Sequence, residues 1–129
     1  MAVRRLTAEG PAPVGIVWQR YVETARWPDW SPQITRVDAD AERIARGVSG
    51  TVHAVGGLRL RFTITDVDLV ARRWSWLVRL GPVQLDLHHE VRAVPGGGSV
   101  TGLVLQGPTA VVTAYAPLAW VALRRLVAR

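Results

Sequence analysis

Hydrophobic residues recur at every second position through much of the chain between Ile34 and Gln106. The clearest case is the run LRLRFTIT at 58–65, in which apolar side chains alternate with arginine and threonine. Such alternation is typical of antiparallel strands that bury one face and expose the other. Turns rich in glycine and proline separate successive runs, so the middle of the chain is predicted to fold as consecutive hairpins. The strands are expected at 34–38, 50–55, 58–65, 73–80, 83–93 and 99–106.

The two ends of the chain have a different pattern. A short first strand over 3–8 is followed by the breaker pair Gly10-Pro11, and apolar residues then fall at helical spacing over 14–22. The segment 26–32 contains two prolines, which limits it to a short helical turn. From 109 to 129 the sequence predicts one long helix that is apolar on most faces, as expected for a helix that is largely surrounded.

Consecutive antiparallel strands with helices at the two ends define an α+β domain. The final helix is the only element that can cover the apolar face of the sheet. We therefore expect a helix-grip fold, a curved antiparallel β-sheet wrapped around a long C-terminal α-helix, with two short helices after strand 1. The 129 residues fit one domain over 1–129.

Composition narrows the classes of function. Cysteine is absent, which excludes disulfides, thiolate nucleophiles and Cys-ligated metals. All 16 basic residues are arginine, which suggests a GC-rich bacterial genome, and they are scattered along the chain, so no nucleic-acid partner is expected. The apolar stretch at 110–127 is interrupted by Arg124 and Arg125, so no membrane span is expected, and the first ten residues do not form a secretory signal. A cytoplasmic location without cofactor is the simplest expectation.

Several segments resemble the polyketide cyclase/dehydrase family of the START-like, birch-pollen-allergen-like (SRPBCC) superfamily. They are PVxxVWxxY at 13–21, WPxWSP at 27–32, WSW at 74–76 and HxVxxxP at 89–95, followed by the terminal helix. The resemblance implies a helix-grip fold around a deep apolar cavity that holds a small hydrophobic molecule, polyketide-like or lipid. The superfamily includes cyclases, dehydratases, lipid carriers and hormone receptors, so the fold alone does not identify the activity. A homodimer is one assembly compatible with the sequence.

Two residues are candidates for catalysis. Alternation places His89 on the same face as Leu87 and Val91, towards the predicted cavity, where an imidazole can act as general acid or base. The competing interpretation is a hydrogen-bonded packing residue. Tyr115 lies in the first half of the terminal helix, and its hydroxyl can orient or protonate a carbonyl oxygen. A buried tyrosine with a backbone partner explains it nearly as well.

The remaining candidates are ligand-lining residues. Trp74, Trp76 and Trp120 can form an aromatic lining for a flat ligand, although core packing would use them equally well. Alternation does not decide the direction of His53. His88 points away from His89, so no metal site is expected. The predicted lining set is Trp74, Trp76, Phe62, Leu87, Val91, Trp120 and His53.

These features favour two functions. The leading hypothesis is a cofactor-independent cyclase/dehydratase-like enzyme of bacterial secondary metabolism, in which the cavity folds a reactive chain and catalysis is largely proximity. The alternative is a non-catalytic carrier or sensor of a lipid or hydrophobic metabolite. A third function, an interaction module that uses a basic outer face of the sheet, receives less support.

Overall fold

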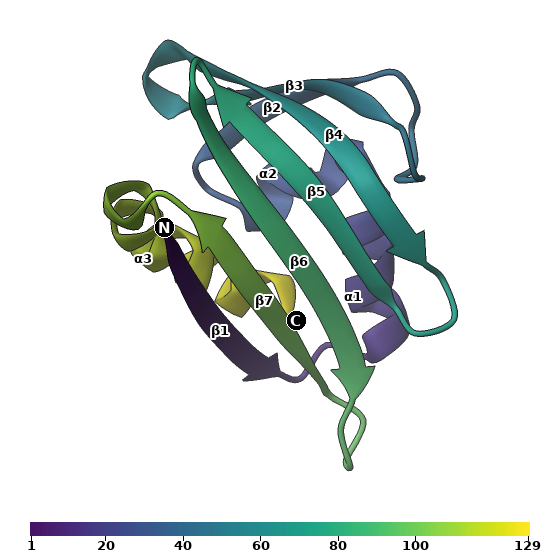
Figure 1. Cartoon of the computed structure of the whole chain (residues 1–129). Helices are drawn as coiled ribbons and strands as arrows, with labels where there is room; N and C mark the ends of the chain where they lie inside the picture. Colours follow the sequence, from purple (N-terminus) through teal and green to yellow (C-terminus); the bar gives the residue numbers. More distant parts are fainter.

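A seven-stranded antiparallel sheet forms the frame of the protein in the computed structural model, which describes residues 1–129 (Figure 1). The strand order is β1-β7-β6-β5-β4-β3-β2, so the first strand joins the sheet beside the last one. The helices lie on one side of the sheet (Figure 1). This architecture confirms the predicted helix-grip fold. The strands are β1 (Ala2–Gly10), β2 (Ile34–Ala39), β3 (Ser49–Ala54), β4 (Leu58–Asp68), β5 (Arg73–Leu80), β6 (Val83–Ala93) and β7 (Ser99–Gly107).

Two strands continue more than one residue beyond their predicted ends. β1 continues to Gly10 because it pairs with the whole of β7, where Gly10 lies opposite Ser99. β4 continues to Asp68 because a register shift between Ile64 and Asp66 changes the alternation without ending the pairing with β5. Such bulges bend a strand and increase its twist, which helps a sheet to curve around other elements.

Burial along β6 alternates as predicted. From Leu85 to Val91 every second side chain faces the helices and is buried, and the intervening ones face solvent or are half-buried. His89 therefore lies on the inner face, and its neighbours His88 and Glu90 are exposed on the outer face. The buried set on this strand is Leu85, Leu87, His89 and Val91.

The helices are α1 (Val14–Val22), α2 (Trp27–Trp30) and α3 (Thr109–Leu126), with 3-10 turns at Thr24–Arg26 and Val55–Gly57. α2 is attached to the end of α1 through two indoles. Trp27 Nε1 donates to the carbonyl oxygen of Tyr21 at 2.9 Å, and Trp30 Nε1 donates to that of Arg20 at 3.1 Å. The last carbonyls of a helix lack partners within the helix, so these bonds stabilise the end of α1 and fix α2. None of the helices has the length and apolar content that crossing a membrane requires.

The end of α3 is held by the segment that joins β1 to α1. The amide of Ala12 donates to the carbonyl oxygen of Val127 at 3.0 Å. Arg20 Nη1 donates to the carbonyl oxygens of Leu126 and Ala128, both at 2.6 Å. A guanidinium at the C-terminal end of a helix also interacts favourably with the helix dipole. α3 is therefore anchored to the rest of the fold at its C-terminal end.

Gly10 lies so close to this anchor that a Cβ at its position would be 2.3 Å from the carbonyl oxygen of Val127. We predict that Gly10→Ala lowers the free energy of unfolding by about 2 kcal/mol, because the backbone of α3 must move away. Gly15 in α1 has no atom within 4 Å of such a Cβ. The control Gly15→Ala should leave stability unchanged or raise it by up to about 1 kcal/mol. Urea denaturation of both variants measures the difference, and equal stabilities would contradict the prediction.

Candidate ligand site

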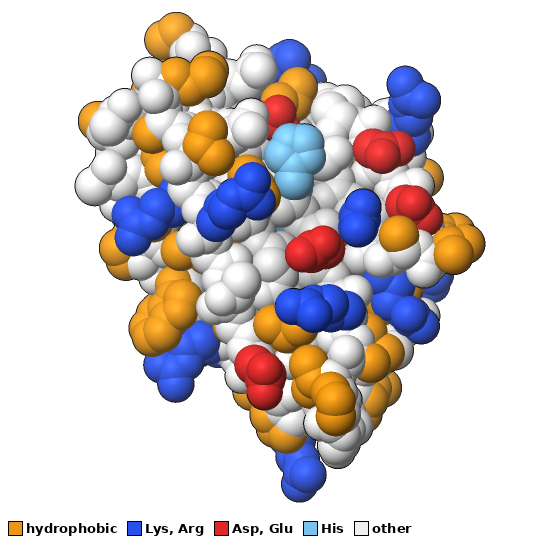
Figure 2. Space-filling model, turned by 60° about the horizontal axis from the view of Figure 1, so that its bottom comes forward, with side chains coloured by type: hydrophobic (Ala, Val, Ile, Leu, Met, Phe, Trp, Pro, Cys, Tyr) orange, Lys and Arg blue, Asp and Glu red, His pale blue; other side chains and the backbone are white.

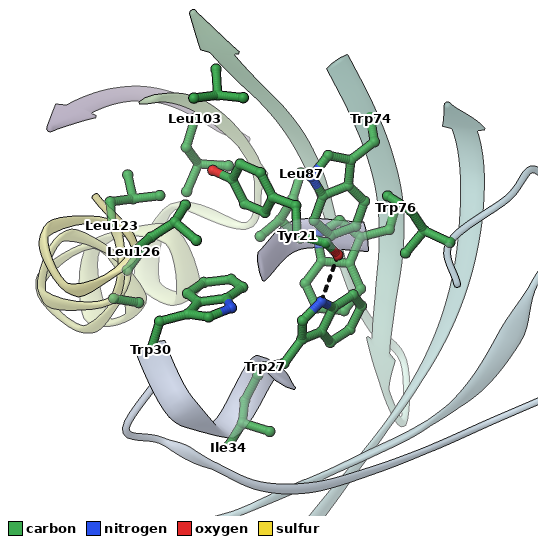
Figure 3. Close-up of a cluster of buried hydrophobic side chains, with 14 of the residues drawn as sticks. Tyr21, Trp27, Trp30, Ile34, Trp74, Trp76, Leu87, Leu103, Leu123 and Leu126 are labelled. Carbon is green, nitrogen blue, oxygen red and sulfur yellow. Dashed lines mark hydrogen bonds between the residues drawn. The ribbon is translucent and has the colours of Figure 1, made fainter. Parts of the chain in front are cut away.

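Tryptophan side chains fill the space between the sheet and the short helices (Figure 3). Trp27 stacks on Trp74, with ring centroids 5.5 Å apart and planes 26° apart, and its centroid lies 4.9 Å from that of Trp76. Trp30 is also buried. The hollow that remains beside these rings has a volume of about 20 Å³. The resemblance implied a deep cavity, but large indoles occupy the centre of this fold.

A larger pocket of about 290 Å³ lies towards one end of the sheet, under the beginning of α3. Thirteen of its fourteen lining residues are hydrophobic, and Gln33 is the exception. Apolar lining with few polar groups is characteristic of small-molecule sites. Two residues of the predicted lining set, Trp76 and Leu87, line it, together with the catalytic candidate Tyr115. The complete lining is Gln33, Ile34, Val52, Ala54, Leu58, Leu60, Trp76, Val78, Leu80, Val83, Leu85, Leu87, Val111 and Tyr115.

Two polar side chains meet in this pocket. Gln33, between α2 and β2, donates from Nε2 to the hydroxyl oxygen of Tyr115 at 3.2 Å. Burial raises the pKa of Tyr115, an effect that the hydrogen bond from Gln33 partly opposes, so the hydroxyl stays protonated. The Oε1 atom of Gln33 is buried and has no hydrogen-bond partner. Gln33 was not among the predicted site residues, because a single glutamine between Pro32 and Ile34 gives no periodic signal.

His89 belongs to a buried hydrogen-bond chain rather than to this pocket. An indole only donates, so the bond from Trp76 Nε1 at 3.1 Å requires His89 Nε2 to be an acceptor. The ring proton is then on Nδ1, which lies 3.3 Å from the hydroxyl oxygen of Tyr21 and donates to it. Thr101 donates its own proton to the carbonyl oxygen of Glu90 at 2.8 Å, so its Oγ1 accepts from Tyr21 at 2.5 Å.

These hydrogen bonds require His89 to be a neutral imidazole, with one ring nitrogen accepting a hydrogen bond and the other donating one. Burial, with a smaller contribution from the nearby charge of His88, lowers the pKa of His89 to about 3. Its ring also stacks on Trp74, with centroids 4.5 Å apart and planes 9° apart. A general acid or base works best with a pKa near the working pH. The catalytic role of His89 stays a prediction, and it would require one of these two hydrogen bonds to break.

The other predicted lining residues lie in different places. Phe62 and Val91 are buried in the core, where Phe62 packs against Trp27 with ring centroids 5.6 Å apart. Trp120 lies outside the pocket, 44% exposed, with the Arg124 guanidinium 4.7 Å from its ring centroid, so its contact with a ligand stays a prediction. Because α3 is apolar on most faces, its pattern did not identify the face that covers the sheet.

His53 also lies outside the pocket, in a polar cluster on the outer side of β2 and β3. Its Nε2 is 2.7 Å from the Oδ2 atom of Asp38, and Arg36 donates to the same oxygen at 3.0 Å. The hydrogen bond from His53, together with Arg36, holds the pKa of Asp38 below its usual value. The neighbouring Val52 is buried and lines the pocket, which settles the direction that alternation left open.

The outer face of the sheet carries charges of both signs. Arg73 and Glu90 form an ion pair at 3.6 Å, and His88 lies 3.2 Å from Asp86. Figure 2 shows arginine, acidic and histidine side chains interspersed over one face of the molecule. Such mixing gives no continuous basic surface there, which weakens the interaction-module hypothesis.

The chain matches the model of one protein family over its whole length, residues 1–129. The family is described as polyketide cyclase/dehydrase and lipid transport, and this protein belongs to it. The resemblance predicted from the sequence is therefore confirmed. No curated protein sequence matches the chain.

Several solved structures of other proteins have the same fold. Ara h 8.0201 superposes with a TM-score of 0.77 at 14% identity, covering 97% of this chain and 94% of its own. XoxI from Bacillus cereus has a TM-score of 0.83 at 14% identity, with coverages of 98% and 94%. The di-domain ARO/CYC protein BexL, from the BE-7585A biosynthetic pathway, has a TM-score of 0.78 at 20% identity and covers 98% of this chain and 45% of its own. Sequence identities this low show only that these proteins share the fold.

The buried state of His89 predicts an acid sensitivity. The folded protein keeps His89 neutral down to pH about 3, whereas an unfolded histidine takes up a proton near its usual pKa of 6.5. The stabilisation is complete above pH 6.5 and is lost as the pH falls towards 3, with a slope of about 1.4 kcal/mol per pH unit. Denaturation between pH 7 and 4 should show this slope in the natural protein, and His89→Gln should lack it. The exposed neighbour provides the control, because His88→Gln should keep the slope.

Proposed function

We propose that this domain binds one small, neutral, apolar molecule in the 290 Å³ pocket and serves as its carrier or sensor. The observation that supports this function is the lining, which is hydrophobic at thirteen of fourteen positions. An apolar molecule gains free energy there because its surface leaves water. The only polar atoms offered by side chains in the pocket come from Gln33, Tyr115 and the indole of Trp76, and the indole already donates to His89.

The size of the pocket limits the ligand. A volume of about 290 Å³ lies at the lower end of the roughly 300–1,000 Å³ typical of ligand pockets. The tryptophan-filled centre of the fold does not extend this space, since the hollow beside the indoles measures about 20 Å³. A molecule with one or two rings, or a short acyl chain, fits these dimensions better than a long lipid.

A pair of variants on α3 tests whether the pocket binds ligands. Val111 lines the pocket, whereas Val121 is 38% exposed and does not line it. 6-Propionyl-2-(dimethylamino)naphthalene, a neutral two-ring dye whose fluorescence changes in apolar surroundings, is expected to bind the natural protein. Val111→Trp should weaken its affinity about tenfold or more by filling the pocket, and Val121→Trp should leave it unchanged. Fluorescence titration measures both, and equal affinities would contradict the proposed site.

Cyclisation of a poly-carbonyl chain is the second candidate, and the protonated hydroxyl of Tyr115 in the pocket favours it. In an aldol closure an α-carbon loses its proton and forms a carbon–carbon bond to the carbonyl carbon, whose oxygen takes up a proton, and the following dehydration releases one water. A hydroxyl that donates to the reacting carbonyl oxygen stabilises the negative charge that develops there. His89 would contribute as acid or base only after releasing Trp76 or Tyr21.

A linear poly-β-ketone thioester is the substrate for testing this second candidate. If the domain is a cyclase, ring formation should exceed the rate in buffer, and Tyr115→Phe should lower the rate by a factor of about 10 or more. The same variant should still bind the dye. His89→Gln then measures any contribution of the imidazole. A product rate equal to that in buffer, with dye binding intact, would eliminate the cyclase and leave the carrier or sensor.

A further inference from the structure

Gln33 and Tyr115 form a polar pair inside an otherwise apolar pocket, and each has a hydrogen-bonding capacity that the protein does not use. The amide of Gln33 is oriented by its bond from Nε2 to the hydroxyl oxygen of Tyr115, 3.2 Å long. That bond uses an acceptor site of Tyr115 and leaves the tyrosine proton without a partner among the side-chain hydrogen bonds of the protein. It also leaves Gln33 Oε1 buried and unpaired. The pair therefore offers a ligand the unpaired acceptor Oε1 of Gln33 and, as a donor, the proton of Tyr115.

An unpaired buried carbonyl oxygen is uncommon in folded proteins, because burial removes its water without replacing the lost hydrogen bond. A ligand that donates to Gln33 Oε1 would restore that bond. The same ligand atom can reach Tyr115, since Oε1 and Nε2 belong to one amide and Nε2 already lies 3.2 Å from the tyrosine oxygen. A single group that both donates and accepts would then satisfy both side chains.

The charge of that group is constrained as well. All fourteen residues around the pocket are uncharged, so a carboxylate or ammonium group would be buried without a counter-ion. A carboxylate would also direct negative oxygen against Gln33 Oε1. An ether or a ketone would accept from Tyr115 but leave Oε1 unpaired.

We propose that the ligand carries a neutral hydroxyl group, alcoholic, phenolic or enolic, whose proton binds Gln33 Oε1 while its oxygen accepts from Tyr115. This inference rests on the proposed function, because it names the ligand class of the same pocket. It excludes fatty acids as the preferred ligands and places the hydroxyl at the Gln33 end of an apolar molecule. Recognition of a hydroxyl by buried polar groups discriminates strongly against an analogue that lacks it, since those groups are then left unpaired.

Three naphthalene probes of nearly the same shape test this inference by isothermal or fluorescence titration at pH 7. 2-Naphthol carries the hydroxyl, 2-fluoronaphthalene replaces it with a similar-sized atom that cannot donate, and 2-naphthoate is charged. The natural protein should bind 2-naphthol about tenfold more tightly than 2-fluoronaphthalene and bind 2-naphthoate most weakly.

Variants then assign the preference to the two side chains. Gln33→Leu and Tyr115→Phe should each reduce the preference for 2-naphthol to less than about threefold while still binding 2-fluoronaphthalene. Gln84→Leu is the matched control, because Gln84 is exposed on β6 and bonds Arg79 outside the pocket. Equal affinities in the natural protein, or a preference that survives in Gln33→Leu, would overturn the hydroxyl inference and leave the proposed function in place. Failure of all three probes to bind would overturn both.

Discussion

The packing of the Trp27 ring against Trp74 and Trp76 is the contact on which the remaining structure depends. It attaches α2 to the sheet, and the bond from the Trp27 indole to the carbonyl oxygen of Tyr21 attaches α1 to α2. Figure 3 shows these rings together in the space that the sheet and helices enclose. Because these rings fill the centre, the apolar pocket lies towards one end of the fold. The same contact thus determines both the packing of the helices and the position of the pocket.

The sequence predicted the frame of the protein well because its signal is local. The alternation along β4 to β7 follows from which face each side chain occupies, so the strands and the inward direction of His89 could be predicted. The strand ends could not, because β1 is extended by pairing with β7 and β4 by a bulge. Long-range pairing and register shifts leave no periodic trace in the residues concerned.

The site was less predictable, for reasons that particular residues make clear. Trp120 and Tyr115 lie on the same apolar helix, yet only Tyr115 faces the pocket, and a pattern that is apolar on most faces does not separate them. Tyr21 fits the helical stripe of α1, so nothing in the sequence marked its hydroxyl as the partner of His89. Gln33 belongs to the site only because α3 passes over it in the folded protein, and nothing in its sequence neighbourhood indicates this. Whether indoles fill a cavity or surround it depends on how they pack in three dimensions, and this cannot be predicted from the sequence.

The hydrogen-bond chain from Trp76 through His89, Tyr21 and Thr101 to the carbonyl oxygen of Glu90 has a consequence for how this family can vary. Each member donates its only available proton to the next, so replacing an inner member (His89, Tyr21 or Thr101) removes a hydrogen-bond partner from both of its neighbours. For example, Tyr21→Phe would leave both the imidazole N–H and the threonine oxygen without a hydrogen-bond partner. Single replacements within the chain should therefore be rare among relatives, and divergent sequences should exchange all its members together for apolar residues or retain the complete set.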